Sequence, residues 1–224
     1  MSNLNSSTLF HYTRTEDVLR KIIEGGFKYY KIAEKLPGRD LGYITKGVCF
    51  CNIPLSNVEQ HASWYGEYSI GVKRAELKKL GCSPVIYAHK DTPFLVKGSS
   101  LSAMKWYETN PLVTSFIKRN EGEQKKKYCK KRNYKDFTKE MEWRLVSGSV
   151  KVAQISNLDE LEEFDPPKES FPNIKISPDM IEYIILSKKE EVQPFSKWLM
   201  DTFPESYLEY IPKIITMSQV LKDF

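Results

Sequence analysis

The amino-acid sequence predicts an α+β protein built on a mixed or antiparallel sheet. Short apolar runs rich in Val, Ile, Phe and Tyr recur from the first twenty residues to the last twenty, as expected for strands. Helical patterns fall between these runs instead of forming a block of their own, and we see no internal repeat. The length of 224 residues suits one domain, or one domain with sizeable insertions.

The first predicted unit is a strand, a turn and a helix. The strand lies in LFHYTR, residues 9–14, and the helix runs from Thr15 or Glu16 to Gly26. Thr15 is a suitable N-terminal cap, and the two glycines at 25 and 26 end the helix. One face of the helix is apolar, formed by Val18, Leu19, Ile22 and Ile23.

The next segments alternate between turns and apolar runs. Residues 28–46 are expected to be a loop with strand fragments, because Pro37, Gly38 and Gly42 are turn residues. An apolar strand over 47–56 follows and breaks at Asn52 and Pro54. Ser56 is predicted to cap a helix over 56–66.

The remaining elements are predicted from composition and periodicity. A strand opens YSIGVKRAEL at 68–77 and leads into a turn, another spans 85–89, and helical material with Pro111 covers 101–118. The later elements are a strand in 141–148, an acidic loop at about 156–173, a strand in 181–187, a helix in 194–203 and a last strand in 210–217.

The bulk composition narrows the class of protein. Hydrophobic residues make up 41% and charged residues 28%, which is ordinary for a globular protein in water. No apolar run is long enough to cross a membrane, and the N-terminus lacks the pattern of a secretory signal. We therefore expect a cytoplasmic protein with reduced cysteines and no membrane partner. The net charge of +5 permits an anionic partner.

Three segments place polar residues at the ends of predicted strands. They are LFHYTR, GVCFCNIPLSNVEQHASWYG and EMEWRL, which are far apart in the sequence and could meet only in the fold. In order, they resemble the three motifs of ADP-ribosyltransferases of the poly-ADP-ribose-polymerase and diphtheria-toxin type. The chain also resembles the AbiGi-type abortive-infection family of bacteria through LFHYT, CFCNIPLS and EMEWR. The resemblance covers roughly residues 8–90 and 138–148.

The resemblance implies a single ADP-ribosyltransferase-like domain over 1–224, with a split sheet, flanking helices and a basic loop at about 118–135. It also implies NAD as substrate and no metal. Breaking the glycosidic bond of NAD needs a carboxylate to stabilise an oxocarbenium-like state, and Glu142 is the candidate, with Glu140 beside it on the same strand face. The implied NAD pocket consists of His11, Tyr12, Thr13, Phe50, Ser56, His61 and Tyr65.

The resemblance also implies roles for four of these residues. His11 would donate to the adenosine ribose, Thr13 would support the nicotinamide ribose, the backbone of Tyr12 would hold the amide, and Tyr65 would stack on the nicotinamide. The chain departs from the usual motif because Tyr12 stands where glycine usually follows the histidine. Trp64 and Tyr68 compete with Tyr65 for the stacking position.

Each of these residues also has a structural interpretation. His11 could be a histidine satisfied by backbone at a strand end, and His61 and Tyr65 could both belong to a core or rim. Glu140 and Glu142 could face solvent, or Glu142 could pair with Arg144 as a structural ion pair. The cysteines at 49 and 51 suggest buried thiols more than metal ligands, even with His61 as a third donor.

A basic run precedes the third motif. Seven of the eleven residues from Lys125 to Lys135 are basic, and two tyrosines are interleaved among them. Such a run is either a solvated loop or a surface that neutralises phosphates and stacks bases. In the resembled fold this segment contacts the acceptor, which suggests RNA or DNA. The predicted nucleic-acid-binding residues are Lys125, Lys126, Lys127, Lys130, Lys131 and Arg132.

The sequence therefore leads to a main hypothesis and two alternatives. The main one is an NAD-dependent mono-ADP-ribosyltransferase that acts as a phage-defence or toxin effector on RNA. The first alternative is a non-catalytic antitoxin or binding module of an abortive-infection pair, with a cognate toxin as partner. The second is a plain NAD glycohydrolase.

Overall fold

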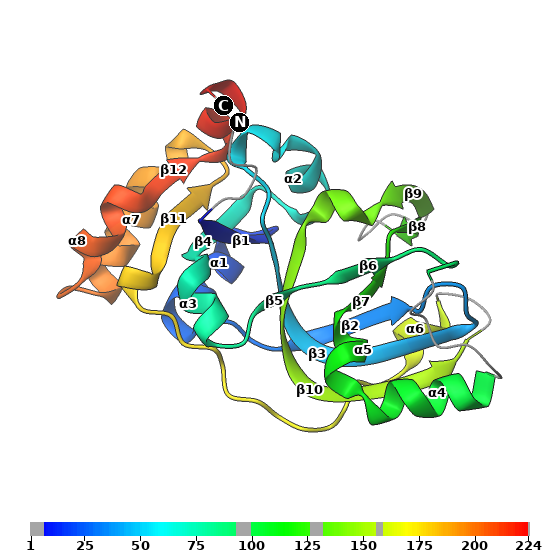
Figure 1. The fold of residues 1–224 in the computed structure, drawn as a ribbon. Coiled ribbons are helices and arrows are strands. Elements are labelled where there is room, and N and C mark those ends of the chain that lie inside the picture. The colour runs from blue at the N-terminus through cyan, green and yellow to red at the C-terminus, as the bar shows by residue number, and fades with distance from the viewer. Residues whose placement is uncertain (1–6, 93–99, 126–131, 156–158, 224) are drawn as a thin grey trace. The chain divides into compact units, whose positions relative to one another are not determined.

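The computed structural model describes residues 7–92, 100–125, 132–155 and 159–223 (Figure 1). The chain divides into two compact units. The first unit comprises residues 1–27, 50–81 and 173–224, and the second comprises residues 28–49 and 82–172. Both units contain helices and strands, so the predicted α+β class is confirmed. The finer expectation of one ADP-ribosyltransferase-like domain stays a prediction.

The sheet of the first unit is mixed. Its strands follow the order β12 (Ile214–Thr216), β11 (Ile181–Leu186), β4 (Tyr68–Lys73) and β1 (Thr8–Thr13). All neighbours are antiparallel except β11 and β12, which are parallel. His11 of β1 lies opposite Ile70 of β4, and Phe10 also pairs with Cys51 at the end of β3. The mixed sheet that the sequence predicts is thus confirmed.

Helix α1 (Glu16–Gly25) forms as its sequence predicts. The Thr15 side chain accepts a hydrogen bond from the Val18 backbone N–H at 3.4 Å, which confirms the predicted cap. Leu19, Ile22 and Ile23 are buried, whereas Val18 at the edge of the apolar face is 37% exposed. Gly26, with φ of 83°, ends the helix where a Cβ would collide with the Ile174 backbone.

The other helices of the first unit correct several boundaries. Ser56 does not cap α2 (Glu59–Tyr65), because that helix starts after Val58. Ser56 lies instead inside the 3-10 helix η1 (Leu55–Asn57). Residues after β4 form α3 (Arg74–Lys79) instead of a turn. The predicted last strand shrinks to β12 because α8 (Tyr207–Tyr210) and η5 (Ile211–Lys213) occupy its first half. The remaining elements are α7 (Val192–Thr202), α9 (Met217–Asp223), η3 (Pro178–Met180) and η4 (Lys189–Glu191).

The second unit is built on longer strands. β3 (Leu41–Cys51), β10 (Glu142–Gln154) and β5 (Ser83–Pro84) are neighbours in that order, and β2 (Tyr30–Lys35) pairs antiparallel with β3. Residues 28–46 are therefore mostly a hairpin, so the predicted strand fragments are longer, and the predicted loop shorter, than expected. Smaller pairs are β6 (Ile86–Ala88) with β7 (Ile117–Arg119), and β8 (Glu121–Lys125) with β9 (Arg132–Asp136).

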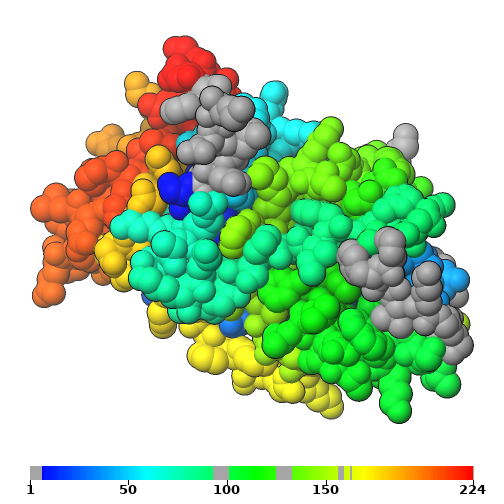
Figure 2. All heavy atoms as spheres, in the orientation of Figure 1, coloured from blue at the N-terminus to red at the C-terminus, as the bar shows by residue number. Residues whose placement is uncertain are grey.

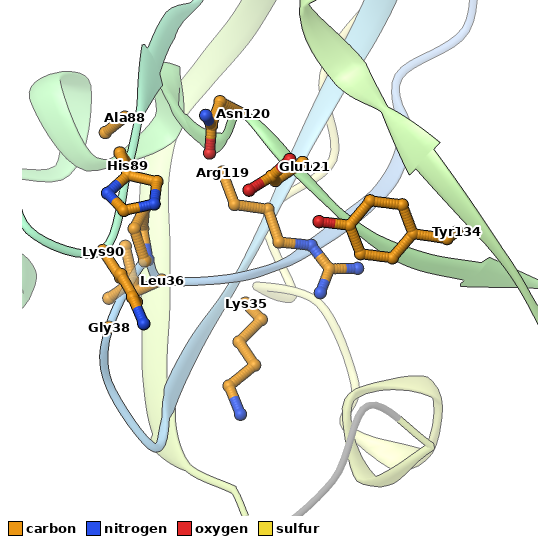
Figure 3. Close-up of a pocket in the computed structure, with 11 residues that line it drawn as sticks. Lys35, Leu36, Gly38, Ala88, His89, Lys90, Arg119, Asn120, Glu121 and Tyr134 are labelled. Atoms are coloured by element: carbon orange, nitrogen blue, oxygen red, sulfur yellow. The ribbon is translucent and has the colours of Figure 1, made fainter.

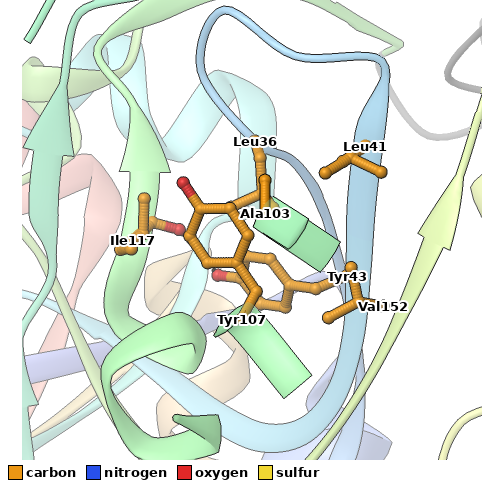
Figure 4. Close-up of a cluster of buried hydrophobic side chains, with 7 residues drawn as sticks. All are labelled: Leu36, Leu41, Tyr43, Ala103, Tyr107, Ile117 and Val152. Carbon is orange, nitrogen blue, oxygen red and sulfur yellow. Dashed lines mark hydrogen bonds between the residues drawn. The ribbon is translucent and has the colours of Figure 1, made fainter. Parts of the chain in front are cut away.

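A buried apolar cluster lies in the second unit, whose described residues also form several helices. These helices are α4 (Ser100–Thr109), α5 (Pro111–Phe116), α6 (Glu160–Glu163) and the 3-10 helix η2 (Phe137–Glu140). Tyr43 and Tyr107 belong to this cluster together with Leu36, Leu41 and Val152 (Figure 4). α4 lies at the surface, green in Figure 2, and its Leu101 side chain is 78% exposed. α6 shows that the predicted acidic loop is not entirely irregular.

Gly66 supplies a test of the first unit. It ends α2 with φ of 121°, and a Cβ there would collide with the Thr13 carbonyl oxygen. Gly81 also has a positive φ, 92°, but an added Cβ would meet nothing within 4 Å. We expect Gly66→Ala to lower the free energy of unfolding by about 3 kcal/mol or more, and Gly81→Ala by about 1–2 kcal/mol. Urea titrations of both variants measure the difference, and equal losses would refute a specific contact at Gly66.

Candidate functional site

The second unit contains charged side chains that are buried instead of solvated. We call this cluster the charge network. It combines three carboxylates with three cations from five elements, β2, β7, β9, η2 and β10. Its members are Glu34, Lys118, Lys135, Glu140, Glu142 and Arg144.

Lys118 of β7 lies at the centre of the network. Its ammonium nitrogen is 2.5 Å from Oε2 of Glu142 and 2.6 Å from Oε2 of Glu140. Oε1 of Glu34 is 3.6 Å away. The Lys118 side chain is only 7% exposed, so one buried cation serves three carboxylates from three elements.

Arg144 of β10 satisfies the other side of the network and is fully buried. Its Nε donates to Oε1 of Glu142 at 2.6 Å, and its Nη2 donates to Oε1 of Glu34 at 2.5 Å. Its Nη1 donates to the Tyr43 hydroxyl at 2.7 Å, and that hydroxyl donates in turn to the Ile117 carbonyl oxygen at 2.7 Å. Arg144 therefore ties β10 to β2, β3 and the start of β7.

Both oxygens of Glu140 and both oxygens of Glu142 accept from a cation. Glu140 uses Oε1 for the Lys135 ammonium, 2.5 Å away, and Oε2 for Lys118. The cations and carboxylates are equal in number, as a buried cluster requires. Taking such charges out of water costs several kcal/mol per ion, and only complete pairing offsets that cost.

The network sets the protonation of its members. Burial alone would raise the pKa of the Glu142 carboxyl, but Arg144 and Lys118 hold that pKa well below its usual range. Burial would raise the pKa of Glu140 as well, but Lys118 and Lys135 together lower that pKa. Enclosure raises the pKa of the Cys49 thiol, and the Glu142 carboxylate beside it adds to the shift. At neutral pH Glu140 and Glu142 are thus charged, and Cys49 is a neutral thiol.

The predicted geometry of the two glutamates needs correction. Glu140 is not on a strand with Glu142, because it ends the 3-10 helix η2 and Met141 follows in the left-handed conformation, with φ of 44°. The two carboxylates meet because Lys118 binds both. Their predicted solvent-facing alternative is wrong, since Glu140 is 3% exposed and Glu142 is 6% exposed. The predicted ion pair between Glu142 and Arg144 is confirmed.

The residues of the predicted NAD pocket lie in the first unit. His11 is half-buried on β1, and its ring meets those of Phe27 and Phe50 edge-on at 5.2 and 5.8 Å. Tyr12 and Thr13 are buried, and the Thr13 hydroxyl donates to the Thr15 carbonyl oxygen at 3.1 Å. These side chains take part in the packing of the sheet end.

The second motif adds three residues to this region. Ring centroids of Tyr12 and His61 are 5.0 Å apart, and those of His61 and Tyr65 are 4.5 Å apart. Ser56 is exposed in η1. Tyr68, a competing candidate for the stacking position, forms a hydrogen bond in which its hydroxyl donates to Glu191 at 2.7 Å. The structure describes each unit by itself, so the expected convergence of His11 and Thr13 with Glu142 stays a prediction.

The basic run falls largely outside the described residues. Lys126, Lys127, Lys130 and Lys131 lie there, while Lys125 and Arg132 are described only as paired backbone positions of β8 and β9. The nucleic-acid hypothesis for this run therefore stays a prediction. Among described residues, no group of three or more metal-ligating side chains comes together, and no helix is long and apolar enough to span a membrane.

Sequence reasoning missed Glu34, Lys118, Lys135 and Tyr43. Lys118 lies in SFIKR, at the end of a stretch predicted as helical, so its strand was not recognised. A lysine that directly follows an apolar residue in a short β-rich run was the available signal. Its partners are 22 and 24 residues further on, which local patterns do not reveal.

The family model described as "Putative abortive phage resistance protein AbiGi, antitoxin" matches residues 44–187. That span is well over half of the chain, so the chain belongs to the AbiGi family, as its motifs predict. No curated protein and no solved structure matched the chain.

Removal of the central cation tests the network. Lys118→Met leaves three carboxylates with only two cations, Lys135 and Arg144, and we expect the free energy of unfolding to fall by about 3–5 kcal/mol. Lys118→Met with Glu142→Gln leaves two complete pairs, Glu34 with Arg144 and Glu140 with Lys135. The double variant should regain part of the loss. Urea titration measures both, with the exposed Lys139→Met as control. A double variant less stable than the single one would contradict this account.

The lowered pKa of Glu142 predicts how stability responds to acid. An unfolded Glu binds its proton at a pKa of about 4.3, whereas folded Glu142 resists protonation. Its contribution is therefore present above that pH and lost as the pH falls below it. Between about pH 5 and pH 3 the wild-type chain should lose stability more steeply than Glu142→Gln. Parallel curves of urea midpoint against pH would show that Glu142 is not the group responsible.

Proposed function

We propose that this chain acts as the antitoxin of an abortive-infection pair, a protein that neutralises a toxin by binding it. The observation that carries the proposal is the saturation of Glu142. Its Oε1 accepts from Arg144 and its Oε2 accepts from Lys118, inside a site where Glu142 is 6% exposed. The family description, which names an antitoxin, points the same way.

Energetics explain why this saturation favours binding over catalysis. A carboxylate that stabilises an oxocarbenium-like state must meet the substrate sugar. To do so, Glu142 would have to release Lys118 or Arg144, leaving a buried cation short of a partner. Breaking one buried pair costs about 3–5 kcal/mol. That cost is comparable to what a single electrostatic contact contributes to catalysis, so Glu142 gains little by leaving the network.

The first unit supports the same proposal. His11, Tyr12, His61 and Tyr65 pack in a chain of ring contacts that also includes Phe27 and Phe50. Such contacts stabilise a sheet end without any ligand. Packing at the end of the sheet is therefore a sufficient reason for aromatic and imidazole side chains at these positions.

NAD-dependent ADP-ribosyl transfer is the second candidate. It is favoured by the fact that the motif residues occupy the expected element positions: His11 and Thr13 in β1, Tyr65 at the end of α2, and Glu142 at the start of β10. This candidate requires the network to open around Glu142 when NAD binds. Transfer would also require an acceptor for the ADP-ribose group, for which the sequence predicts RNA.

Two measurements on the full-length chain separate the candidates. The antitoxin proposal predicts that co-production of the chain restores growth to cells making the cognate toxin, and that the purified chain releases no nicotinamide from NAD. Glu142→Gln should lower rescue only as far as it lowers the folded fraction. The exposed Glu59→Gln removes the same charge from α2 and serves as the control.

Transferase or glycohydrolase activity would give a different result. Wild-type chain would release nicotinamide, and Glu142→Gln would reduce the rate per folded molecule by about 100-fold or more. Labelled NAD incubated with total RNA or total protein would then distinguish transfer from hydrolysis and identify the acceptor. Release of nicotinamide by the wild-type chain would contradict the proposal that the chain is a non-catalytic antitoxin.

A further inference from the structure

A cavity of about 410 Å³ lies in the second unit, on strands that also carry the charge network. Successive residues of a strand point to opposite faces. In β7, Lys118 enters the network and its neighbour Arg119 lines the cavity; in β9, Lys135 enters the network and Tyr134 lines the cavity. The volume is within the range of about 300–1,000 Å³ that is typical of small-ligand sites.

Cations outnumber carboxylates in the wall of this cavity. Lys35, Lys90 and Arg119 come from three separate segments, and Glu121 is the one carboxylate among the lining residues. In Figure 3, His89 and Lys90 lie on one side of the space and Arg119 on the other, with Lys35 below. This excess of positive charge favours an anionic ligand.

Three carboxylates lie near these cations, and each already interacts with a residue that lines the cavity. Glu121 accepts a hydrogen bond from the Tyr134 hydroxyl. Asp40 is 3.5 Å from the Lys35 ammonium and 78% exposed, and Asp91 is 3.3 Å from Nδ1 of His89 and 75% exposed. Exposed pairs of this kind are weak and screened by solvent, so an anion can compete for Lys35 and His89.

Arg119 is held in place before any ligand arrives. Its Nη2 donates to the Glu123 carbonyl oxygen, and its guanidinium lies over the Phe137 ring, 5.1 Å from the centroid. Gly122 leaves the room that this position needs, because a Cβ there would lie 2.7 Å from Nη1 of Arg119. A fixed, planar guanidinium is well suited to bind phosphate through two parallel hydrogen bonds.

Tyr134 supplies an aromatic surface beside these cations. Tyr134 is 69% exposed, and its hydroxyl donates a hydrogen bond to Glu121. Exposed aromatic rings next to cationic groups stack on bases while the cations hold the phosphate. The Asn120 side chain also lines the cavity and offers both a donor and an acceptor (Figure 3).

We infer that this cavity binds a phosphate-bearing ligand of the nucleotide class. Lys35, Lys90 and Arg119 hold the phosphate, and the base stacks on Tyr134. A free nucleotide and a nucleotide unit of an RNA strand share this chemistry. The inference does not depend on the proposed antitoxin function, because ligand binding is measured on the chain alone.

The test uses the full-length chain with two probes, adenosine triphosphate and a 5′-phosphorylated six-nucleotide RNA. Binding is measured by isothermal titration calorimetry. Lys35→Gln and Lys90→Gln should each weaken the binding of at least one probe by about five- to tenfold, because each removes a charge-assisted hydrogen bond. Tyr134→Leu should weaken it by a similar factor through loss of stacking. Lys78→Gln removes the same charge from an exposed position of the first unit and should change binding by less than about twofold.

The outcomes assign the ligand or remove the site. Binding of the triphosphate that depends on Lys35 and Lys90 identifies a free nucleotide site, whereas the same dependence for RNA alone identifies a strand-binding site. The inference is overturned if neither probe binds, or if Lys78→Gln weakens binding as much as the cavity variants do. Lys90 is exposed and Lys35 is partly exposed, so both variants should keep the wild-type melting temperature.

Discussion

The pairing of Lys118 with Glu140 and Glu142 is the interaction on which the second unit depends. β7 has only three residues, and η2 is a short 3-10 helix, so neither has much hydrogen bonding of its own to fix its position. A buried charge without a partner costs several kcal/mol, which leaves these segments one acceptable arrangement. Arg144 extends the constraint to β2 and β3 through Glu34 and Tyr43. The network therefore specifies the fold of this unit more than it stabilises it.

The same constraint decides what Glu142 can do chemically. A carboxylate held between a guanidinium and an ammonium is a poor base, because its pKa is already low. It can stabilise positive charge only where it already does so, on Lys118 and Arg144. Binding a partner protein makes no demand on such a group, since binding requires a rigid surface and not a reachable carboxylate. The geometry of this site is thus compatible with the binding role proposed for the chain.

The sequence correctly predicted those helices and strands that depend on residues close together in the chain. β1, β11 and α1 have apolar runs, a periodic face and a Thr15 cap, and all three form where expected. β2 was missed because YKIAEK buries only Ile32 and shows little alternation. The left-handed Met141 has no sequence signal, since residues other than glycine rarely adopt positive φ. The network itself was largely invisible, because partners such as Arg144 and Glu34 are 110 residues apart.

The charge network and the cationic cavity are linked through the two strands they share. Lys118 and Arg119 are neighbours in β7, and both lie over the Phe137 ring, at 5.0 and 5.1 Å from its centroid. Lys118 and Arg119 therefore share a neighbour, the Phe137 ring. Binding to the folded state alone stabilises that state, and linkage of this kind is reciprocal. An anion bound in the cavity should accordingly favour the ordered arrangement of β7 and β9, and an intact network should strengthen the binding of that anion.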